Sequence, residues 1–281
     1  MIRIRSPGRI CLFGEHQDYL GYPIISLAIS KYIFLEAQKV NKPIFSIHFP
    51  DIETEIEIKL RNKELTYESN RDYIKSGYNL FVRKGIKFPR GYDIKIWGNL
   101  PINAGVASSS ALIIAWIYFL SLSSNREISS PYNLALQGYN AEVKEFNEAG
   151  GMMDHFSSVF GKLIFLQEQA QKPVLNFYDL LLNGFVLGNS MERKSTVDDL
   201  RKVKKNSLDS FRILKDIYPN FNKYHTSLVQ ITPYLDSIEK KFRKKIIGNL
   251  SNRDITNSAR NLIDNYYKIK DLATESQKNL F

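Results

Sequence analysis

One stretch near the middle of the chain, SSSALIIAWIYFLSLSS (108–124), is apolar on almost every side. A surface helix keeps a polar face toward water, so a helix that is apolar all round has to be buried. No apolar run in the chain reaches the ~18 residues that cross a bilayer, so we expect protein rather than lipid around this helix. The stretch therefore predicts a soluble globular domain in which a buried helix over 108–122 packs on a sheet.

Strands are predicted on both sides of this helix in the sequence. TEIEIKL (54–60) alternates apolar and polar residues, as a half-buried strand does, and it ends a β-rich region that we expect to form an antiparallel meander over 24–60. A helix is expected to begin near an Asn70 cap. The further expectations are strands at 92–98, 162–167, 173–178 and 184–190, helices at 70–85 and 131–147, a short helix through MMDHFSSVFG (152–161), and nearly all helix from the last of these strands to Phe281.

This order of elements predicts an α+β fold with two domains. The N-terminal domain is expected over 1–180 and a helix-rich, incomplete C-terminal domain over 181–281. The boundary is placed ahead of the strand expected at 184, although no Pro/Gly-rich linker marks it.

Charge and cysteine content limit the partners. The single cysteine, Cys11, excludes an intrachain disulfide and a multi-cysteine metal site. The formal net charge is +10, which favours anionic partners such as nucleic acid, lipid or ATP. The basic residues gather at 191–205 and 239–245, where we favour a solvated helix face, and no nucleic-acid-binding pattern accompanies them. We expect no nucleic-acid and no membrane partner. Since Met1–Arg5 has no apolar signal-peptide core, we expect a cytoplasmic protein.

A loop of small residues leads into the buried helix. PINAGVASSSALIIAW (101–116) is typical of a strand, a loop and a helix. Small side chains let a phosphate approach the backbone, and the first N–H groups of a helix lack internal partners. Three hydroxyls follow, at Ser108, Ser109 and Ser110. A lysine at the position that a P-loop requires is missing. Taken alone, the stretch indicates a phosphate loop or a serine-capped buried helix equally well.

Two acidic residues stand in apolar surroundings farther along, in NAEVKEFNEAGGMMDHFSSVFG (140–161). Acidic residues are rarely buried without a partner. A carboxylate such as Glu142 beside the serine loop could hold magnesium, and a second one, Asp154, could take a proton from a hydroxyl. The alternative is that Asp154 caps or salt-bridges a neighbouring element.

Charge also crowds into the first motif of the chain, RSPGRICLFGEHQDYLGY (5–22). This motif resembles the first motif of galactokinases, approximately P-G-R-x-N-L-I-G-E-H-T-D-Y-x-G-G, and the chain resembles the superfamily of galactokinase, homoserine kinase, mevalonate kinase and phosphomevalonate kinase. INAGVASSSAL resembles that family's phosphate loop and GGMMDHFSSVFG its G-I-M-D-Q segment. The resemblance covers residues 1 to ~205 and rests on long motifs. The residues that match in the first motif are Pro7, Gly8, Arg9, Leu12, Gly14, Glu15, His16, Asp18, Tyr19 and Gly21.

The resemblance implies a function and a fold. It implies ATP-dependent phosphorylation of a monosaccharide, galactose or a related sugar, at the anomeric hydroxyl to give a sugar 1-phosphate. The implied fold is a two-layer N-terminal domain like domain 2 of ribosomal protein S5, with a partial ferredoxin-like C-terminal domain. The implied partners are the sugar, ATP and Mg²⁺.

The resemblance also implies residue roles. Asp154 and Arg9 match the catalytic residues, and Glu15, His16 and Asp18 match the residues that bind the sugar. Ser109 and Glu142 match the magnesium ligands. The phosphates would lie on the loop residues Gly105, Val106, Ala107, Ser108, Ser109 and Ser110.

Departures from the family pattern keep a second interpretation open. His155 stands where the family usually has glutamine, for which we expect little effect, and Ala107 replaces a glycine or serine. No counterpart is found for an aromatic residue that some galactokinases place against the sugar, or for the closing glycine-rich motif, roughly G-A-G-x-G-G. The alternative is therefore a catalytically weak or inactive galactokinase-like protein, a sensor or truncated copy that binds sugar or nucleotide.

Overall fold

The computed structural model describes residues 1–61, 63–102, 104–126, 128–169, 172–180, 182, 184–188 and 196–278. Contacts divide the chain into two compact units, which are described separately here. The first contains residues 1–10, 26–164 and 177–198, and the second contains residues 11–25, 165–176 and 199–281. The division of the sequence at residue 180 stays a prediction.

The first unit contains a mixed sheet in the strand order β4-β3-β5-β2, with β1 paired to β2. β3 and β4 form the antiparallel hairpin that alternation predicts, with Ile47 opposite Ile56. The expected meander over 24–60 is wrong in one step, because β5 lies between β2 and β3, antiparallel to β2 and parallel to β3. A parallel pair needs a crossover, which helix α1 supplies. The strands are β1 (Ile2–Phe13), β2 (Ile24–Val40), β3 (Ile44–Phe49), β4 (Thr54–Lys59) and β5 (Gly91–Gly98).

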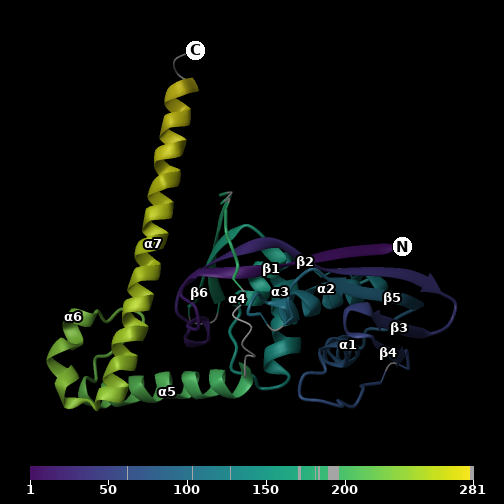
Figure 1. Ribbon diagram of the computed structural model, residues 1–281, viewed down its shortest axis with the longest axis horizontal. Coiled ribbons are helices and arrows are strands. Elements are labelled where there is room, and N and C mark those ends of the chain that lie inside the picture. Colours follow the sequence, from purple (N-terminus) through teal and green to yellow (C-terminus); the bar gives the residue numbers. More distant parts are fainter. Residues whose placement is uncertain are drawn as a thin grey trace. The chain divides into compact units, whose positions relative to one another are not determined.

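Four helices belong to the same unit, and Figure 1 shows α1, α2 and α3 beside its strands. The predicted central helix is confirmed as α2, in which Trp116 and Phe119 are completely buried. The Trp116 indole Nε1 donates to the backbone oxygen of Ile74 in α1 at 2.9 Å. α1 starts after Asp72, whose carboxylate accepts from the Lys75 N–H, and not at Asn70. The helices are α1 (Tyr73–Arg83), α2 (Ser108–Ser123), α3 (Pro131–Tyr139) and α4 (Met153–Phe160), with a 3₁₀ turn at Pro50–Ile52.

The helix expected over 131–147 is interrupted. α3 ends at Tyr139, and the chain continues as a π-helical turn over Asn140–Lys144. π-helical turns are rare and frequently lie at functional sites, and this one carries Glu142.

The second unit is mostly helical in its described part, as expected for the chain after residue 190. A 3₁₀ turn over Asp18–Leu20 packs Leu20 and Tyr22 into a core with Phe211 and Leu214 of α5. Figure 1 shows α7 extending well past α5 and α6. The elements are β6 (Leu163–Gln169), β7 (Lys172–Tyr178), α5 (Thr196–Ile217), α6 (Leu228–Ile231), a 3₁₀ turn at Thr232–Ser237, and α7 (Lys240–Lys278).

The strand expected at 184–190 is wrong for residues 184–188, which form no strand. Apolar character alone predicted it, yet Phe185, Val186 and Leu187 are exposed, Val186 to 93%. An exposed apolar run that has no neighbouring strand to pair with is not stabilised as a strand, because strand stability comes from packing against neighbours. Residues 189 and 190 lie outside the described residues.

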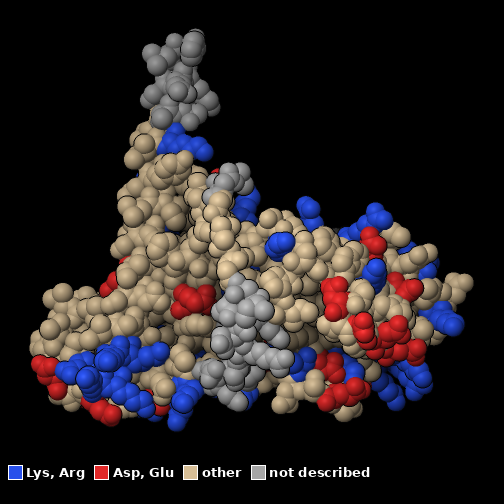
Figure 2. Space-filling model, in the orientation of Figure 1, with Lys and Arg blue, Asp and Glu red and all other residues tan. Residues whose placement is uncertain are grey.

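The surface agrees with the interpretation of the basic stretches as solvated faces. Figure 2 shows Lys and Arg side chains gathered over the region of α5 and the start of α7. Lys202 and Lys205 of α5 and Lys240, Lys241 and Lys244 of α7 are exposed. Among the described helices, none is long and apolar enough to cross a membrane.

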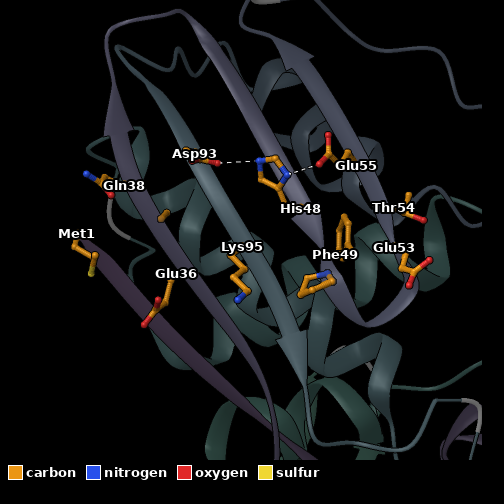
Figure 3. A pocket seen from close by; sticks show the side chains of 12 residues that line it. Met1, Glu36, Gln38, His48, Phe49, Glu53, Thr54, Glu55, Asp93 and Lys95 are labelled. Atoms are coloured by element: carbon orange, nitrogen blue, oxygen red, sulfur yellow. Dashed lines mark hydrogen bonds and ion pairs between the residues drawn. The ribbon is translucent and has the colours of Figure 1, made fainter.

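His48 forms ion pairs that link three strands on the exposed face of the first unit's sheet. His48 of β3 places Nδ1 2.9 Å from a Glu55 oxygen on β4 and Nε2 3.0 Å from an Asp93 oxygen on β5. Figure 3 shows the ring lying between the two carboxylates. The hydrogen bond to Glu55 raises the pKa of His48 above its usual value, and Asp93 adds to the effect.

The contacts of His48 with Glu55 and Asp93 predict that the stability of the fold depends on pH. Because the folded-state pKa is raised, the stabilisation is complete below the unfolded pKa of ~6.5 and is lost as the pH rises through the folded value. His48→Gln should therefore lower the free energy of unfolding at pH ~5.5 but not at pH ~9. The loss should stay below ~1 kcal/mol, because the group is largely exposed and solvent screens it.

Urea unfolding at the two pH values measures the difference, with His225→Gln in the second unit as the control. If His48→Gln lowers the free energy of unfolding equally at both pH values, the charge of His48 does not stabilise the fold through Glu55 and Asp93.

Candidate functional site

Arg9 and Asp154 form a close ion pair within the first unit. Arg9 of β1 is 7% exposed, and Asp154 lies in the first turn of α4 with a side chain that is 30% exposed. The guanidinium places Nε 2.7 Å and Nη2 2.6 Å from Oδ1 of Asp154. Its Nη1 donates to the backbone oxygen of Gly105 at 2.8 Å. One side chain therefore joins a strand, a helix and the small-residue loop.

The small-residue loop lies directly against β1. The Arg9 N–H donates to the Val106 oxygen at 3.1 Å. A Cβ on Gly8 would stand 2.6 Å from that same oxygen, so the approach requires glycine. Gly105 has a φ of +77°, and nothing lies within 4 Å of where its Cβ would be. Ala107 also adopts a left-handed φ of 62°. Non-glycine residues in this region store strain, which often marks functional loops.

The N-terminus of α2 opens from this loop without a side-chain cap. Ala107 occupies the N-cap position, and its methyl side chain makes no capping hydrogen bond. The serine-capped alternative is therefore not what the chain adopts. The first backbone N–H groups of α2 have no intrahelical partner, and the helix dipole is positive there. A phosphate fits these donors, because Gly105 leaves open space and the hydroxyls of Ser108 and Ser109 are partly exposed.

Glu142 lies beneath the serines on the π-helical turn and is 6% exposed. Its Oε2 accepts from the Ser110 hydroxyl at 2.7 Å and lies 2.8 Å from Nε2 of His155. Burial alone would raise the pKa of Glu142, but hydrogen bonds from His155, Ser109 and Ser110 outweigh it and lower the pKa. The carboxylate is thus held ionised in a buried place.

The serine and glutamate oxygens suit a magnesium ion that also binds phosphate. Mg²⁺ prefers oxygen ligands and usually takes one or two carboxylates from the protein, with phosphates and waters completing its shell. Ser109 and Glu142 supply a hydroxyl and a carboxylate of this kind. No group of three His, Cys, Asp or Glu residues that could hold a metal occurs among the described residues.

The remaining predicted residues lie on the 14–22 loop of the second unit. Glu15 and His16 are exposed, and Asp18 accepts from the Tyr19 N–H at 3.0 Å. His16 has a left-handed φ of 57°. The buried Gln17 side chain anchors the loop by donating to the Pro23 oxygen at 2.7 Å and to Thr256 of α7 at 3.3 Å.

The first unit thus brings together most of the predicted residues. Arg9 and Asp154 meet at Gly105, and Ser109 and Ser110 meet Glu142. The residues Glu15, His16 and Asp18 belong to the second unit, and their convergence with the others stays a prediction. His155, for which little effect was expected, lies beside Glu142, and its departure from the family pattern is the sequence signal that points to it.

Family models match two segments of the chain. The galactokinase galactose-binding signature matches residues 2–39, and the N-terminal domain of GHMP kinases matches residues 72–162. These segments contain the 14–22 loop, the small-residue loop, Glu142 and Asp154.

Individual relatives agree with these models. The galactokinase of Pyrococcus furiosus is 31% identical over 218 residues, which are 76% of this chain and 60% of that protein. The galactokinase of Clostridium perfringens is 28% identical over 274 residues, 92% of this chain and 69% of that protein. The chain thus spans 60% of the length of the Pyrococcus relative and 44% of the length of the Thermotoga maritima galactokinase.

Solved structures show the same fold. The Lactococcus lactis galactokinase complexed with galactose has a TM-score of 0.76 at 19% identity, covering 93% of this chain and 69% of that one. The Methanococcus jannaschii mevalonate kinase has a TM-score of 0.59 at 17% identity, covering 91% and 79%. The motifs, the family models and the relatives agree, and the chain is a galactokinase-like member of the GHMP kinase superfamily.

Proposed function

We propose that this protein is an ATP-dependent sugar kinase that phosphorylates galactose or a related monosaccharide at the anomeric hydroxyl. The observation that carries the proposal is the Arg9–Asp154 pair, which joins the backbone at Gly105 beside an uncapped helix N-terminus. A proton acceptor, a fixed cation and a set of phosphate donors together are what phosphoryl transfer to a hydroxyl requires.

Asp154 is the proton acceptor in this proposal. The anomeric oxygen attacks the γ-phosphorus, its proton passes to the Asp154 carboxylate, the bond from the γ-phosphorus to the bridging oxygen breaks, and ADP leaves. Asp154 is suited to this role because its side chain remains 30% exposed while Arg9 holds one of its oxygens. The Arg9 charge lies beside the reacting oxygen and stabilises negative charge as it moves onto the transferring phosphoryl group.

The phosphates would bind along residues 105–110. The backbone N–H groups at the start of α2 donate to phosphate oxygens, and Gly105 leaves room for a close approach. Ser109 and Glu142 would hold the Mg²⁺ ion, which neutralises phosphate charge when bound. The hydrogen bonds from Ser110 and His155 keep Glu142 ionised and oriented for this.

The sugar would bind at Glu15, His16 and Asp18, which the galactose-binding signature covers. Carboxylates accept from sugar hydroxyls, and a histidine both donates and accepts. A site of this kind rejects analogues that lack a hydroxyl, because a protein group is then left unpaired. The anchored Gln17 side chain holds the loop in its left-handed turn at His16.

The finer architecture is also a proposal. The superfamily membership supports a two-layer N-terminal domain over 1–180 that resembles domain 2 of ribosomal protein S5. It likewise supports a partial ferredoxin-like C-terminal domain over 181–281, for which the helices α5 and α7 are the described part.

The proposed base predicts the effect of Asp154→Asn. The substitution should lower turnover by ~10²–10⁴-fold, the usual contribution of a general base. Galactose affinity should stay within about threefold, because the amide keeps the volume and still offers Arg9 an oxygen. A coupled assay of ADP release measures turnover, and calorimetry measures sugar binding.

Asp216→Asn, an exposed substitution on α5, serves as the control and should change neither quantity. Unchanged turnover in Asp154→Asn would show that Asp154 is not the base. Wild-type protein that binds sugar and nucleotide without turnover would instead support the inactive, binding-only alternative.

The proposed sugar loop predicts a separate effect for Asp18→Asn. A hydrogen bond to a charged group contributes ~1.5–3 kcal/mol, so galactose affinity should fall by about 10–150-fold. Binding of a non-hydrolysable ATP analogue should not change, since the phosphate loop is untouched. Calorimetry with each ligand tests both statements. Weakened nucleotide binding with unchanged galactose affinity would place the sugar elsewhere.

A further inference from the structure

We propose that His155 is a positioning residue, which holds the Glu142 carboxylate so that it can bind magnesium together with Ser109. The proposal rests on the proposed function, because it assigns the metal side of the same site. It gives a role to the residue that stands where the G-I-M-D-Q pattern has glutamine.

The contact is buried and close. His155 is 1% exposed on α4, and its Nε2 lies 2.8 Å from Oε2 of Glu142 on the π-helical turn. Oε2 also accepts from the Ser110 hydroxyl in the first turn of α2. Two donors on one oxygen fix the plane of the carboxylate. Oε1 is the oxygen that neither of these two donors uses.

The chemistry of the contact fixes the histidine tautomer. In a hydrogen bond to a carboxylate oxygen the ring nitrogen is the donor, so Nε2 of His155 donates to Oε2 of Glu142. The other nitrogen, Nδ1, is buried and has no hydrogen-bond partner among the described residues. A buried polar atom without a partner costs stability. An apolar side chain of similar size would fill the space without that cost, so packing alone does not account for a histidine here.

The ring is held rigidly where this hydrogen bond forms. It lies edge-on to the Tyr139 ring, with centroids 5.7 Å apart and planes at 77°. Gly138 provides the space beside it, because a Cβ there would come within 3.3 Å of Cδ2 of His155 and 2.4 Å of Ile114 Cδ1. A histidine has two side-chain torsions and glutamine has three, so this ring holds its N–H direction with less loss of freedom than an amide would.

The test compares two substitutions by the affinity for Mn²⁺ in the presence of a non-hydrolysable ATP analogue, measured by electron paramagnetic resonance. His155→Leu removes the donor and should weaken Mn²⁺ binding by ~10–100-fold, as loss of a ligand's hydrogen-bond partner does. His155→Gln restores an N–H donor and should recover affinity to within about threefold of wild type. The Mg²⁺ concentration for half-maximal turnover should shift in the same order, while the maximal turnover changes less.

A third variant, Gly138→Ala, tests whether the position of the His155 ring matters. Gly138→Ala keeps His155 but crowds it, so its Mn²⁺ affinity should lie between those of wild type and His155→Leu. It also keeps the proposal testable if His155→Leu does not fold. His48→Gln, on the exposed face of the sheet, is the matched control and should leave Mn²⁺ binding unchanged.

A second readout needs neither activity nor metal. The chain contains four histidines, so the imidazole ¹⁵N signals of His155 can be assigned by their loss in His155→Gln. The wild-type spectrum should show a proton on Nε2 that is hydrogen-bonded to Glu142. A proton on Nδ1 alone, or a His155→Leu variant that binds Mn²⁺ as tightly as wild type, would overturn the proposal.

Failure of the proposed function would look different. Wild-type protein that binds no Mn²⁺–nucleotide at all would overturn the kinase function and the metal-positioning role together. The Nε2–H signal would then still report whether the His155–Glu142 hydrogen bond exists.

Discussion

The ion pair between Arg9 and Asp154 is the interaction on which the candidate site depends. A guanidinium that is 7% exposed must have partners, because an unpaired buried charge is strongly destabilising. Asp154 and the Gly105 oxygen supply them through three different nitrogens. The hydrogen bonds that compensate the buried charge of Arg9 also fix the relative positions of β1, the small-residue loop and α4. A bidentate, planar guanidinium can do this, whereas a lysine would offer one point charge.

The surrounding backbone shows how the chain holds this arrangement. Ser158 of α4 donates to the Pro7 oxygen at 2.9 Å, and Ser157 meets Ser26 of β2 at 2.6 Å. α4 is thus fastened to two strands on the side away from solvent. Against this rigid support, Ala107 can keep its left-handed φ, because the packing of Gly8 on Val106 leaves the loop little other room.

The sequence predicted the elements whose signals are local. The all-round apolar character of 108–124 predicted α2, and the alternation of 54–60 predicted β4. What it missed depends on partners far away in the chain. β5 pairs with both β2 and β3, and the periodicity of a strand's own residues does not indicate which strands it pairs with. The exposed stretch 184–188 looked like a strand because its apolar residues were read without knowing that no neighbour pairs with them.

The site itself was predictable in part for the same reason. Long motifs indicated Arg9, Glu142 and Asp154 as site residues, but not which donor each carboxylate would meet. The π-helical turn at 140–144 could not be foreseen, because a helical pattern predicts a regular continuation of α3. That turn brings Glu142 to Ser110 and His155, so the contact on which the proposed role of His155 rests appears only in three dimensions.

Placing Asp154 and His155 side by side on one helix has a mechanical consequence. Consecutive residues of a helix point about 100° apart, so α4 directs one side chain to Arg9 and the next to Glu142. The side chains of Asp154 and His155, the proposed proton acceptor and the proposed positioning residue, are therefore both set by the position of a single backbone segment. A shift of α4 would disturb both contacts at once, whereas two separate loops could move independently. The hydrogen bonds from Ser157 and Ser158 oppose such a shift, and in this way they protect the relative positions of the two halves of the site.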